Sequence, residues 1–380
     1  MIPRHVLESI PHRADSRILS SLRVDDVVIN AVSGGLSRNG VFCGTVGSDA
    51  SLIQYAIRSW ESATYDSERI CKILDFQAYL VGKQIAAPKP ICWLSNERLI
   101  PYEQSFWTIE SWLAGKSLVG GADVSDSLLS EIVGCLVDLH TAGRNFGTIH
   151  PTSPGITERI RNISDWKERA MVATSEKWIS KMSRFGPLPN VSTEQLSRIE
   201  KGFGLALQVI QYLGSSWVHQ LNMFLDRKPR CHWIIRDLWR SNILIDQDRI
   251  TGVVDFGASR TDWPILELVR CLSSFLQPDD SRWQASLDGY YEQLQTRNAA
   301  VGAEAFDCDW KVDLEGIRTL DHVATTLSLL YWYDWLTSED FESINRPKPA
   351  IWTRVEELAA RLSRFHSCNL YHFLHKKHPL

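Results

Sequence analysis

The sequence predicts an α+β protein with two lobes, a small β-rich N-terminal lobe and a large helical C-terminal lobe. Residues 24–60 alternate apolar and polar side chains between clusters of glycine, serine, asparagine and aspartate, which is typical of antiparallel strands. Later in the chain the apolar residues recur at helical spacing, and one short β-like segment at 243–255 interrupts them. A chain of 380 residues usually forms two domains or one enzyme with two lobes. We therefore expect an N-terminal lobe at 1–112 and a C-terminal lobe at 113–380, with a helical insertion at about 150–230.

Five tracts of the first lobe predict strands. They read VDDVVINAV, VFCGTVG, LIQYAIRSW, ICWLSN and SFWTIESWL, and they begin at residues 24, 41, 52, 91 and 105. Such tracts are rich in β-branched and aromatic residues, and turn-forming residues separate them. The first lobe is therefore expected to contain a small five-stranded sheet.

One helix is predicted in the first lobe, over residues 66–84. Its apolar residues at helical spacing are Ile70, Ile73, Leu74 and Leu80. Asp66 and Ser67 are both available as N-caps, since their side chains can accept the free N–H groups of the first turn.

The second lobe reads as helices broken by a hairpin. SDSLLSEIVGCLVDLHTAG begins with a capping serine and reaches a possible glycine stop at Gly143, and a long helical pattern covers 192–224. ILID and ITGVVD flank the turn Gln247-Asp248-Arg249, which predicts a short hairpin. Asp246 and Asp248 are therefore expected to serve the turn and not to bind a metal.

Composition narrows the classes of function. The formal net charge is −4, which gives no electrostatic footprint for nucleic acid or for an anionic membrane surface. The eight cysteines are scattered and none forms a CxxC pair, which favours free thiols in a reducing compartment. The N-terminus lacks the apolar core of a signal peptide, and no window approaches the length of a membrane span. We expect a cytoplasmic protein with no nucleic-acid or membrane partner; the sequence leaves the oligomeric state open.

The most informative stretch is IIRDLWRSNILI followed by VVDFG. It sets Asp237 five residues before Asn242, and Asp255 thirteen residues after that asparagine. Phosphoryl transfer requires that Mg²⁺ and the phosphates be positioned and that an acceptor hydroxyl be aimed in line. Mg²⁺ prefers hard oxygen ligands, which an Asp carboxylate and an Asn carboxamide supply. A further carboxylate near the acceptor can take or orient its proton.

These segments resemble the catalytic and metal-binding segments of the protein-kinase-like fold, and in particular the aminoglycoside and choline phosphotransferase family. SGGLSRNGVFCGTV resembles the glycine-serine nucleotide loop of that family and the strand after it. LVDLH at 136–140 resembles its Leu-x-x-Leu-His helix, and ASRTDWPILELVRCL resembles the stretch after the metal-binding aspartate. The resemblance covers roughly residues 25–290 and is most specific at 234–257.

The resemblance implies an ATP- and Mg²⁺-dependent enzyme of the bilobal protein-kinase-like fold. Asp237 would be the catalytic base or would orient the acceptor, and Asn242 and Asp255 would bind Mg²⁺. The phosphates would lie under a loop formed by Ser33, Gly34, Gly35 and Ser37. The backbone near Glu110, Ser111 and Trp112 would receive the adenine.

The sequence departs from the family at three places. Arg58, in YAIRSW, stands where the family has a phosphate-binding lysine; arginine also presents cationic donors, in a larger and stiffer head. Ile235 and Arg236 replace the usual His-Gly before the catalytic aspartate. Glu267 stands where the family has an aspartate that supports the catalytic loop, and the longer carboxylate is expected to do the same with adjustment.

The partner of Arg58 on the following helix is not decided by the sequence. Glu68, the one glutamate of the helix, lies ten residues after Arg58, and Asp75 is the alternative. We favour Glu68; either residue could also be a solvated surface charge.

Three functions compete. The leading one is a phosphotransferase that acts on the hydroxyl of an aminoglycoside-, choline- or sugar-like small molecule. The second is a nucleotide-binding pseudokinase with a regulatory or interaction role, which Arg58 and Ile235 favour. The third, a protein kinase, is disfavoured because the sequence lacks an Ala-Pro-Glu segment and an evident activation loop after Asp255.

Overall fold

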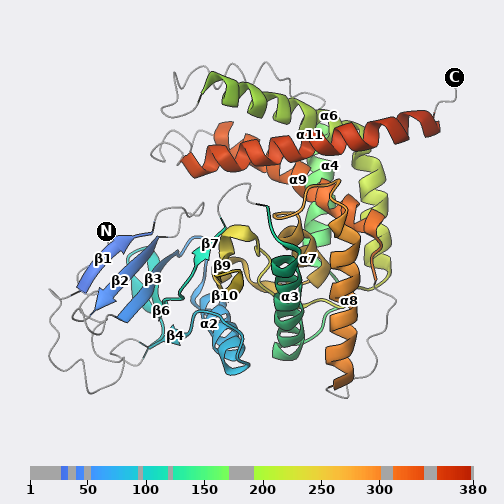
Figure 1. Ribbon diagram of the computed structural model, residues 1–380. Coiled ribbons are helices and arrows are strands. Elements are labelled where there is room, and N and C mark those ends of the chain that lie inside the picture. Colours follow the sequence, from blue (N-terminus) through green and yellow to red (C-terminus); the bar gives the residue numbers. More distant parts are fainter. Residues whose placement is uncertain are drawn as a thin grey trace. The chain divides into compact units, whose positions relative to one another are not determined.

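The computed structural model describes residues 27–32, 40–46, 53–92, 97–118, 123–170, 192–300, 311–337 and 349–377. The contacts within the chain divide it into two compact units. The first contains Met1–Ala122 and Ser241–Ser259, and the second contains Asp123–Arg240 and Arg260–Leu380. The first unit is mainly β and the second mainly helical, which confirms the predicted α+β class (Figure 1).

An antiparallel sheet of six strands forms the centre of the first unit (Figure 1). The strands are β1 Val27–Ala31, β2 Val41–Val46, β3 Ile53–Glu61, β4 Pro90–Ile91, β5 Ile100–Tyr102 and β6 Ser105–Ser111. Their order is β1-β2-β3-β6-β4, and β5 also pairs with β6. Four of the five predicted strands are present as β1, β2, β3 and β6. The fifth, ICWLSN, overlaps β4 only at Ile91, and its residues 93–96 lie outside the described residues. Strand β5 was not predicted, because it has only three residues and carries Pro101, which is tolerated at a sheet edge.

Helix α2, Ser67–Gly82, follows β3. The Asp66 side chain accepts the N–H of Arg69 at 2.7 Å, so Asp66, and not Ser67, is the N-cap. The four apolar residues expected on its inner face are fully buried. The helical spacing therefore predicted both the helix and the face that packs in the core.

The predicted hairpin forms from β9 Ile243–Asp246 and β10 Arg249–Val253 and belongs to the first unit. Gln247 and Asp248 both have positive φ, of 47° and 61°, as expected for a two-residue turn that follows the twist of its strands. Strand β7, Lys116–Ser117, pairs with β9, and Val253 donates its N–H to the carbonyl of Ala86 at 2.9 Å. Backbone hydrogen bonds thus join the hairpin to chain segments more than a hundred residues earlier.

The second unit is built from long helices around a two-stranded ribbon of β8 His232–Ile234 and β11 Arg260–Asp262. The helices are α3 Asp126–Phe146, α4 Pro154–Ala170, α6 Thr193–Asp226, α7 Pro264–Leu272, α8 Arg282–Ala300, α9 Leu314–Thr337 and α11 Pro349–Lys377. Helix α6 packs against α4, α9 and α11, and α3 packs against α8. Trp283, Tyr290, Phe203 and Phe365 are among the largest side chains that are fully buried.

Helix α3 corrects one expectation about a glycine. The helix runs through Gly143 to Phe146 and does not stop at the glycine. A Cβ at Gly143 would lie 1.9 Å from the carbonyl oxygen of Trp233, which is not possible sterically. Glycine is required there because strand β8 approaches the helix closely.

Candidate active site

Asn242 and Asp255 lie at the two ends of the hairpin of the first unit. Asn242 ends the 3-10 turn Arg240–Asn242 before β9, and Asp255 follows β10 with a left-handed backbone, at φ 65°. Val254 donates its N–H to the carbonyl of Asn242 at 2.9 Å. Two side chains thirteen residues apart in sequence are thereby anchored on adjacent backbone, and their assignment to a shared metal site stays a prediction.

The oxygen donors fit a magnesium ion that also binds phosphate. Asn242 is 7% exposed, whereas the Asp255 side chain is 43% exposed. Among the described residues, no group of three His, Cys, Asp or Glu side chains forms a metal site by itself. Mg²⁺ in nucleotide enzymes usually takes one or two protein carboxylates and completes its shell with phosphates and water. An Asn–Asp pair matches that kind of site.

Arg58 on β3 makes an ion pair with Asp255. Its Nη1 donates to Asp255 Oδ1 at 2.7 Å, and its guanidinium lies over the ring of Trp60, 5.1 Å from the centroid. Burial acts to lower the pKa of Arg58, but Asp255 and then Glu110 outweigh it and raise that pKa. The structure therefore brings together two of the residues that the sequence assigned to the nucleotide, from positions 197 apart.

Glu110, on β6, is a buried carboxylate in the same place. It is 2% exposed and accepts a hydrogen bond from Gln77 Nε2 at 3.1 Å. Burial raises its pKa, and Arg58 and Gln77 oppose that rise. Its Oε1 has no hydrogen-bond partner among the described residues. Arg58 therefore lies between one exposed carboxylate and one buried carboxylate.

The residue of α2 that contacts this site is Gln77, which donates a hydrogen bond to Glu110. The sequence analysis did not single it out. Glu68 is exposed in the first turn of α2, and Asp75 pairs with Arg98 at 2.6 Å. The structure does not bring Glu68 to Arg58, whose described ion pair is with Asp255. The signal that could have identified Gln77 is its place in the apolar stripe, seven residues after Ile70, where a polar side chain needs a buried partner.

In the segment expected to receive adenine, two backbone N–H groups already donate hydrogen bonds within the protein. Ser111 donates its N–H to the carbonyl of Lys89 at 2.9 Å, and Trp112 donates to that of Gln54 at 3.2 Å. Adenine would meet these two N–H groups only if those bonds were exchanged, so the role of Glu110 and Trp112 as a hinge stays a prediction. The loop residues Ser33, Gly34, Gly35 and Ser37 lie outside the described residues.

Asp237 lies in the second unit, in the loop that follows β8. Leu238, beside it, is fully buried and anchors the loop, while the Asp237 side chain is 44% exposed. Arg270 on α7 donates to Asp237 Oδ1 through Nη2 at 3.0 Å and through Nε at 3.2 Å. The sequence did not assign Arg270 a role.

Arg236 precedes Asp237 with a left-handed backbone, at φ 73°. This is a conformation that glycine adopts without strain, which explains why the resembling family has glycine here. Arginine is held in it from two sides. Its N–H donates to Glu267 Oε1, and its guanidinium pairs with Glu158 at 2.6 Å. The expected role of Glu267 as a support of the catalytic loop is consistent with this contact.

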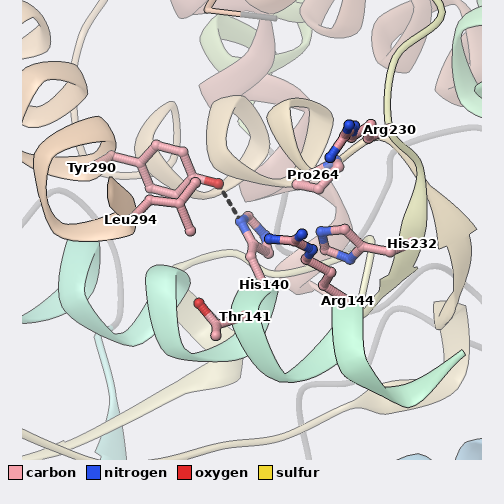
Figure 2. A pocket seen from close by; sticks show the side chains of 8 residues that line it. All are labelled: His140, Thr141, Arg144, Arg230, His232, Pro264, Tyr290 and Leu294. Carbon is pink, nitrogen blue, oxygen red and sulfur yellow. Dashed lines mark hydrogen bonds between the residues drawn. The ribbon is translucent and has the colours of Figure 1, made fainter. Parts of the chain in front are cut away.

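Glu267 is held in turn by a buried chain of polar groups. Its Oε2 lies 3.1 Å from His140 Nε2, and His140 Nδ1 lies 2.7 Å from the hydroxyl of Tyr290. Figure 2 shows His140 reaching from α3 toward Tyr290 of α8. The histidine of the LVDLH tract therefore helps to fix the carboxylate that holds the loop.

A small cavity lies beside His140, lined also by Thr141, Arg144, Arg230, His232, Pro264, Tyr290 and Leu294 (Figure 2). Its volume is about 10 Å³, enough for one water molecule. Burial, and then His140, lower the pKa of His232 to about 3. This cavity is too small to receive a substrate.

The comparison of sequences identifies a family and a relative. The model of the phosphotransferase enzyme family, APH, matches residues 28–302, which is more than half of the chain. A homoserine kinase of Gluconobacter oxydans (strain 621H) is 22% identical over 304 residues, which cover 78% of this chain and 79% of that protein.

The comparison of structures identifies the fold. Amicoumacin kinase hAmiN in complex with AMP-PNP, Ca²⁺ and Ami has a TM-score of 0.51 at 12% identity, covering 94% of each chain. The choline kinase from Cryptosporidium parvum Iowa II has a TM-score of 0.51 at 12% identity, covering 96% of each chain. These likenesses show the kinase-like fold that the sequence predicted. None of the described helices is long and apolar enough to cross a membrane.

Proposed function

Because the chain belongs to the phosphotransferase enzyme family and is a small-molecule kinase, we propose that it transfers the γ-phosphate of ATP, with Mg²⁺, to a hydroxyl group of a small molecule. The observation that carries this proposal is the meeting of Arg58, Asn242 and Asp255 in one unit. A buried cation beside two oxygen donors is the set of groups that a metal–triphosphate complex needs.

Each residue has a distinct role in the proposal. Asn242 and Asp255 hold Mg²⁺, and Arg58 binds phosphate oxygens from the pair it already forms with Asp255. A magnesium ion held by Asn242 and Asp255 would supply positive charge against the phosphates. Asp237 accepts or orients the proton of the acceptor hydroxyl.

Glu110 supports Arg58 in this scheme. Its buried carboxylate adds an attraction to the guanidinium that does not depend on Asp255, so Arg58 would keep one carboxylate neighbour if Asp255 held the metal. The free thiols of the described cysteines suit a reducing compartment, and we place the enzyme in the cytoplasm as part of the proposal.

The test separates the nucleotide site from the acceptor site. Calorimetry with Mg²⁺·ATP is expected to show a marked loss of affinity in Asp255→Ala and little change in Asp237→Ala. ADP release with an accepted substrate is expected to fall about 10²–10⁴-fold in kcat in Asp237→Asn, the range typical of positioned acid–base groups. Equal, undiminished Mg²⁺·ATP affinity in both alanine variants would remove Asp255 from the metal site.

A pseudokinase would behave differently in the same measurements. It would bind Mg²⁺·ATP and release no ADP above background with any hydroxyl compound, and Asp237→Asn would change nothing. An Asp237→Asn enzyme that keeps most of its turnover would refute the role given to Asp237.

A further inference from the structure

The catalytic loop of the second unit is surrounded by arginines that carboxylates do not fully neutralise. Besides Arg270, which pairs with Asp237, the guanidiniums of Arg354 on α11 and Arg159 on α4 interact electrostatically with Arg270. Arg270 is therefore the shared neighbour of the other two. We call Arg159, Arg270 and Arg354 the arginine cluster.

Arg354 is a largely buried member of the cluster. Its side chain is 12% exposed, and its one described ion pair is with Glu357 on the same helix, at 3.4 Å. Burial, and then repulsion from Arg270, lower the pKa of Arg354 to about 9. Glu357 also interacts with Arg240, so one carboxylate is shared between two guanidiniums.

Arg159 is the third member of the cluster. Its Nη1 donates to the backbone carbonyl of Gly155 at 3.0 Å, and among the described residues it makes no ion pair with a carboxylate. Burial lowers the pKa of Arg159 to about 10. Asp262 is the largest influence that opposes this lowering, and burial outweighs it. A guanidinium that is taken out of water costs free energy unless an anion completes its surroundings.

A flat aromatic surface lies within the cluster. The ring of Trp239, two residues after Asp237, has the guanidinium carbon of Arg354 at 4.6 Å and that of Arg270 at 5.6 Å from its centroid. The indole ring of Trp239 therefore packs against the guanidinium groups of both Arg270 and Arg354, and Arg270 also pairs with the Asp237 carboxylate. Arginine forks held in this way suit a carboxylate or phosphate group, which accepts two parallel hydrogen bonds.

We propose that the acceptor carries a carboxylate, which Arg270 and Arg354 bind over Trp239 while its hydroxyl faces Asp237. The assignment of this anion to the acceptor rests on the proposed phosphotransferase function. A cationic acceptor such as an aminoglycoside or choline would meet like charges at the cluster, which disfavours it. The acceptor class is therefore a hydroxy acid.

The first experiment detects the anion site without turnover. Thermal shift and calorimetry with malonate are expected to show saturable binding to the wild-type protein. Arg354→Gln should weaken it on the order of 10- to 100-fold, the range of a lost charge-assisted hydrogen bond. Arg354→Lys should recover part of the affinity because the charge returns. Arg364→Gln, an exposed position on the same helix, is the matched control and should bind malonate as the wild type does.

The second experiment identifies the source of the anion. Acceptors are compared in pairs that differ only by an acid group: L-homoserine with 3-aminopropan-1-ol, L-serine with ethanolamine, and glycerate with ethylene glycol. ADP release is expected to favour the acid of each pair, and Arg354→Gln should abolish that preference by raising KM for the acid. Higher kcat/KM for the amine or neutral member would overturn the proposal.

Three further outcomes are decisive. Inorganic phosphate binding with no malonate or hydroxy-acid binding would assign the cluster to the transferred phosphate and overturn its role in the acceptor. Malonate binding that is unchanged in Arg354→Gln, or absent from the wild type, would also overturn it. Mg²⁺·ATP binding is measured on the same samples: if it is absent while malonate binds, the phosphotransferase proposal fails and the anion site stands.

Discussion

The two units treat buried arginine in opposite ways. In the first, Arg58 lies between Asp255 and Glu110, and their attraction raises its pKa despite burial. In the second, nearby carboxylates do not outweigh burial at Arg159 and Arg354, and the pKa values of these residues fall to about 10 and about 9. Carboxylates outweigh burial at Arg58 but not at Arg159 or Arg354. Our proposals give this difference a role: Arg58 belongs to the nucleotide site, and the second unit keeps positive charge for an anionic ligand.

Arg58 offers the largest expected effect on this comparison. Arg58→Ala removes the cation that binds phosphate and leaves Glu110 buried without its guanidinium, so Mg²⁺·ATP affinity should fall on the order of 10- to 100-fold. Arg58→Lys should keep a substantial part of the Mg²⁺·ATP affinity, because lysine restores the positive charge although it lacks the planar guanidinium. Calorimetry with Mg²⁺·AMP-PNP measures both.

Arg98→Ala is the matched control within the same unit. Arg98 pairs with Asp75 at 2.6 Å on the surface, so its loss should leave nucleotide affinity unchanged. A folded Arg58→Ala protein with wild-type affinity would show that the Arg58–Asp255 pair is structural and has no part in phosphate binding.

The sequence predicted the local structure of this site better than the contacts around it. The spacing of Asp237, Asn242 and Asp255 indicated a catalytic loop and a hairpin, because local turn and strand patterns determine both. The pairing of Gln77 with Glu110 was not predictable in this way, since it depends on how α2 packs against β6. Local sequence patterns predict turns, strands and helices, which depend on residues close together in the chain. They do not predict contacts between elements that are distant in the sequence.

Arg270 shows a signal that was present and overlooked. It lies three residues after Glu267 on α7, so the two side chains are neighbours on the helix surface. Glu267 holds the backbone of Arg236, and Arg270 pairs with Asp237. One helix turn thus contacts two successive residues of the catalytic loop, which the motif alone does not reveal.

Acid should weaken the second unit before the first. His232 and His322, both in the second unit, are buried, and burial, the largest cause, lowers each pKa to about 3. The unfolded chain binds these protons below about pH 6.5 and the folded chain does not, so stability falls as the pH drops from about 6.5 toward 3. At pH 5 the loss is about 2 kcal/mol for each histidine.

Hydrogen exchange at pH 7.5 and pH 5 tests where this loss occurs. Protection should fall in the second unit, because no histidine lies among the described residues of the first. His232→Gln and His322→Gln should each reduce the pH dependence of the unfolding free energy, whereas His219→Gln, exposed on α6, should not. An equal loss of protection in both units would contradict the assignment.

Arg236 is an arginine of the second unit that pairs with two carboxylates, and it gives the smallest and sharpest effect. Its guanidinium pairs with Glu158 at 2.6 Å and with Asp262 at 3.4 Å, while its backbone remains left-handed at φ 73°. Arg236→Ala and Arg236→Gly both lose the ion pairs, so their comparison isolates the backbone. Glycine ordinarily destabilises relative to alanine, but here it removes a left-handed strain of about 1–2 kcal/mol. Arg236→Gly should therefore be the more stable variant by about 1 kcal/mol in urea unfolding at pH 7.5. Alanine equal to or better than glycine would mean that the loop relaxes out of this conformation once the ion pairs are gone. The ion pairs with Glu158 and Asp262 would then be what holds the backbone before Asp237.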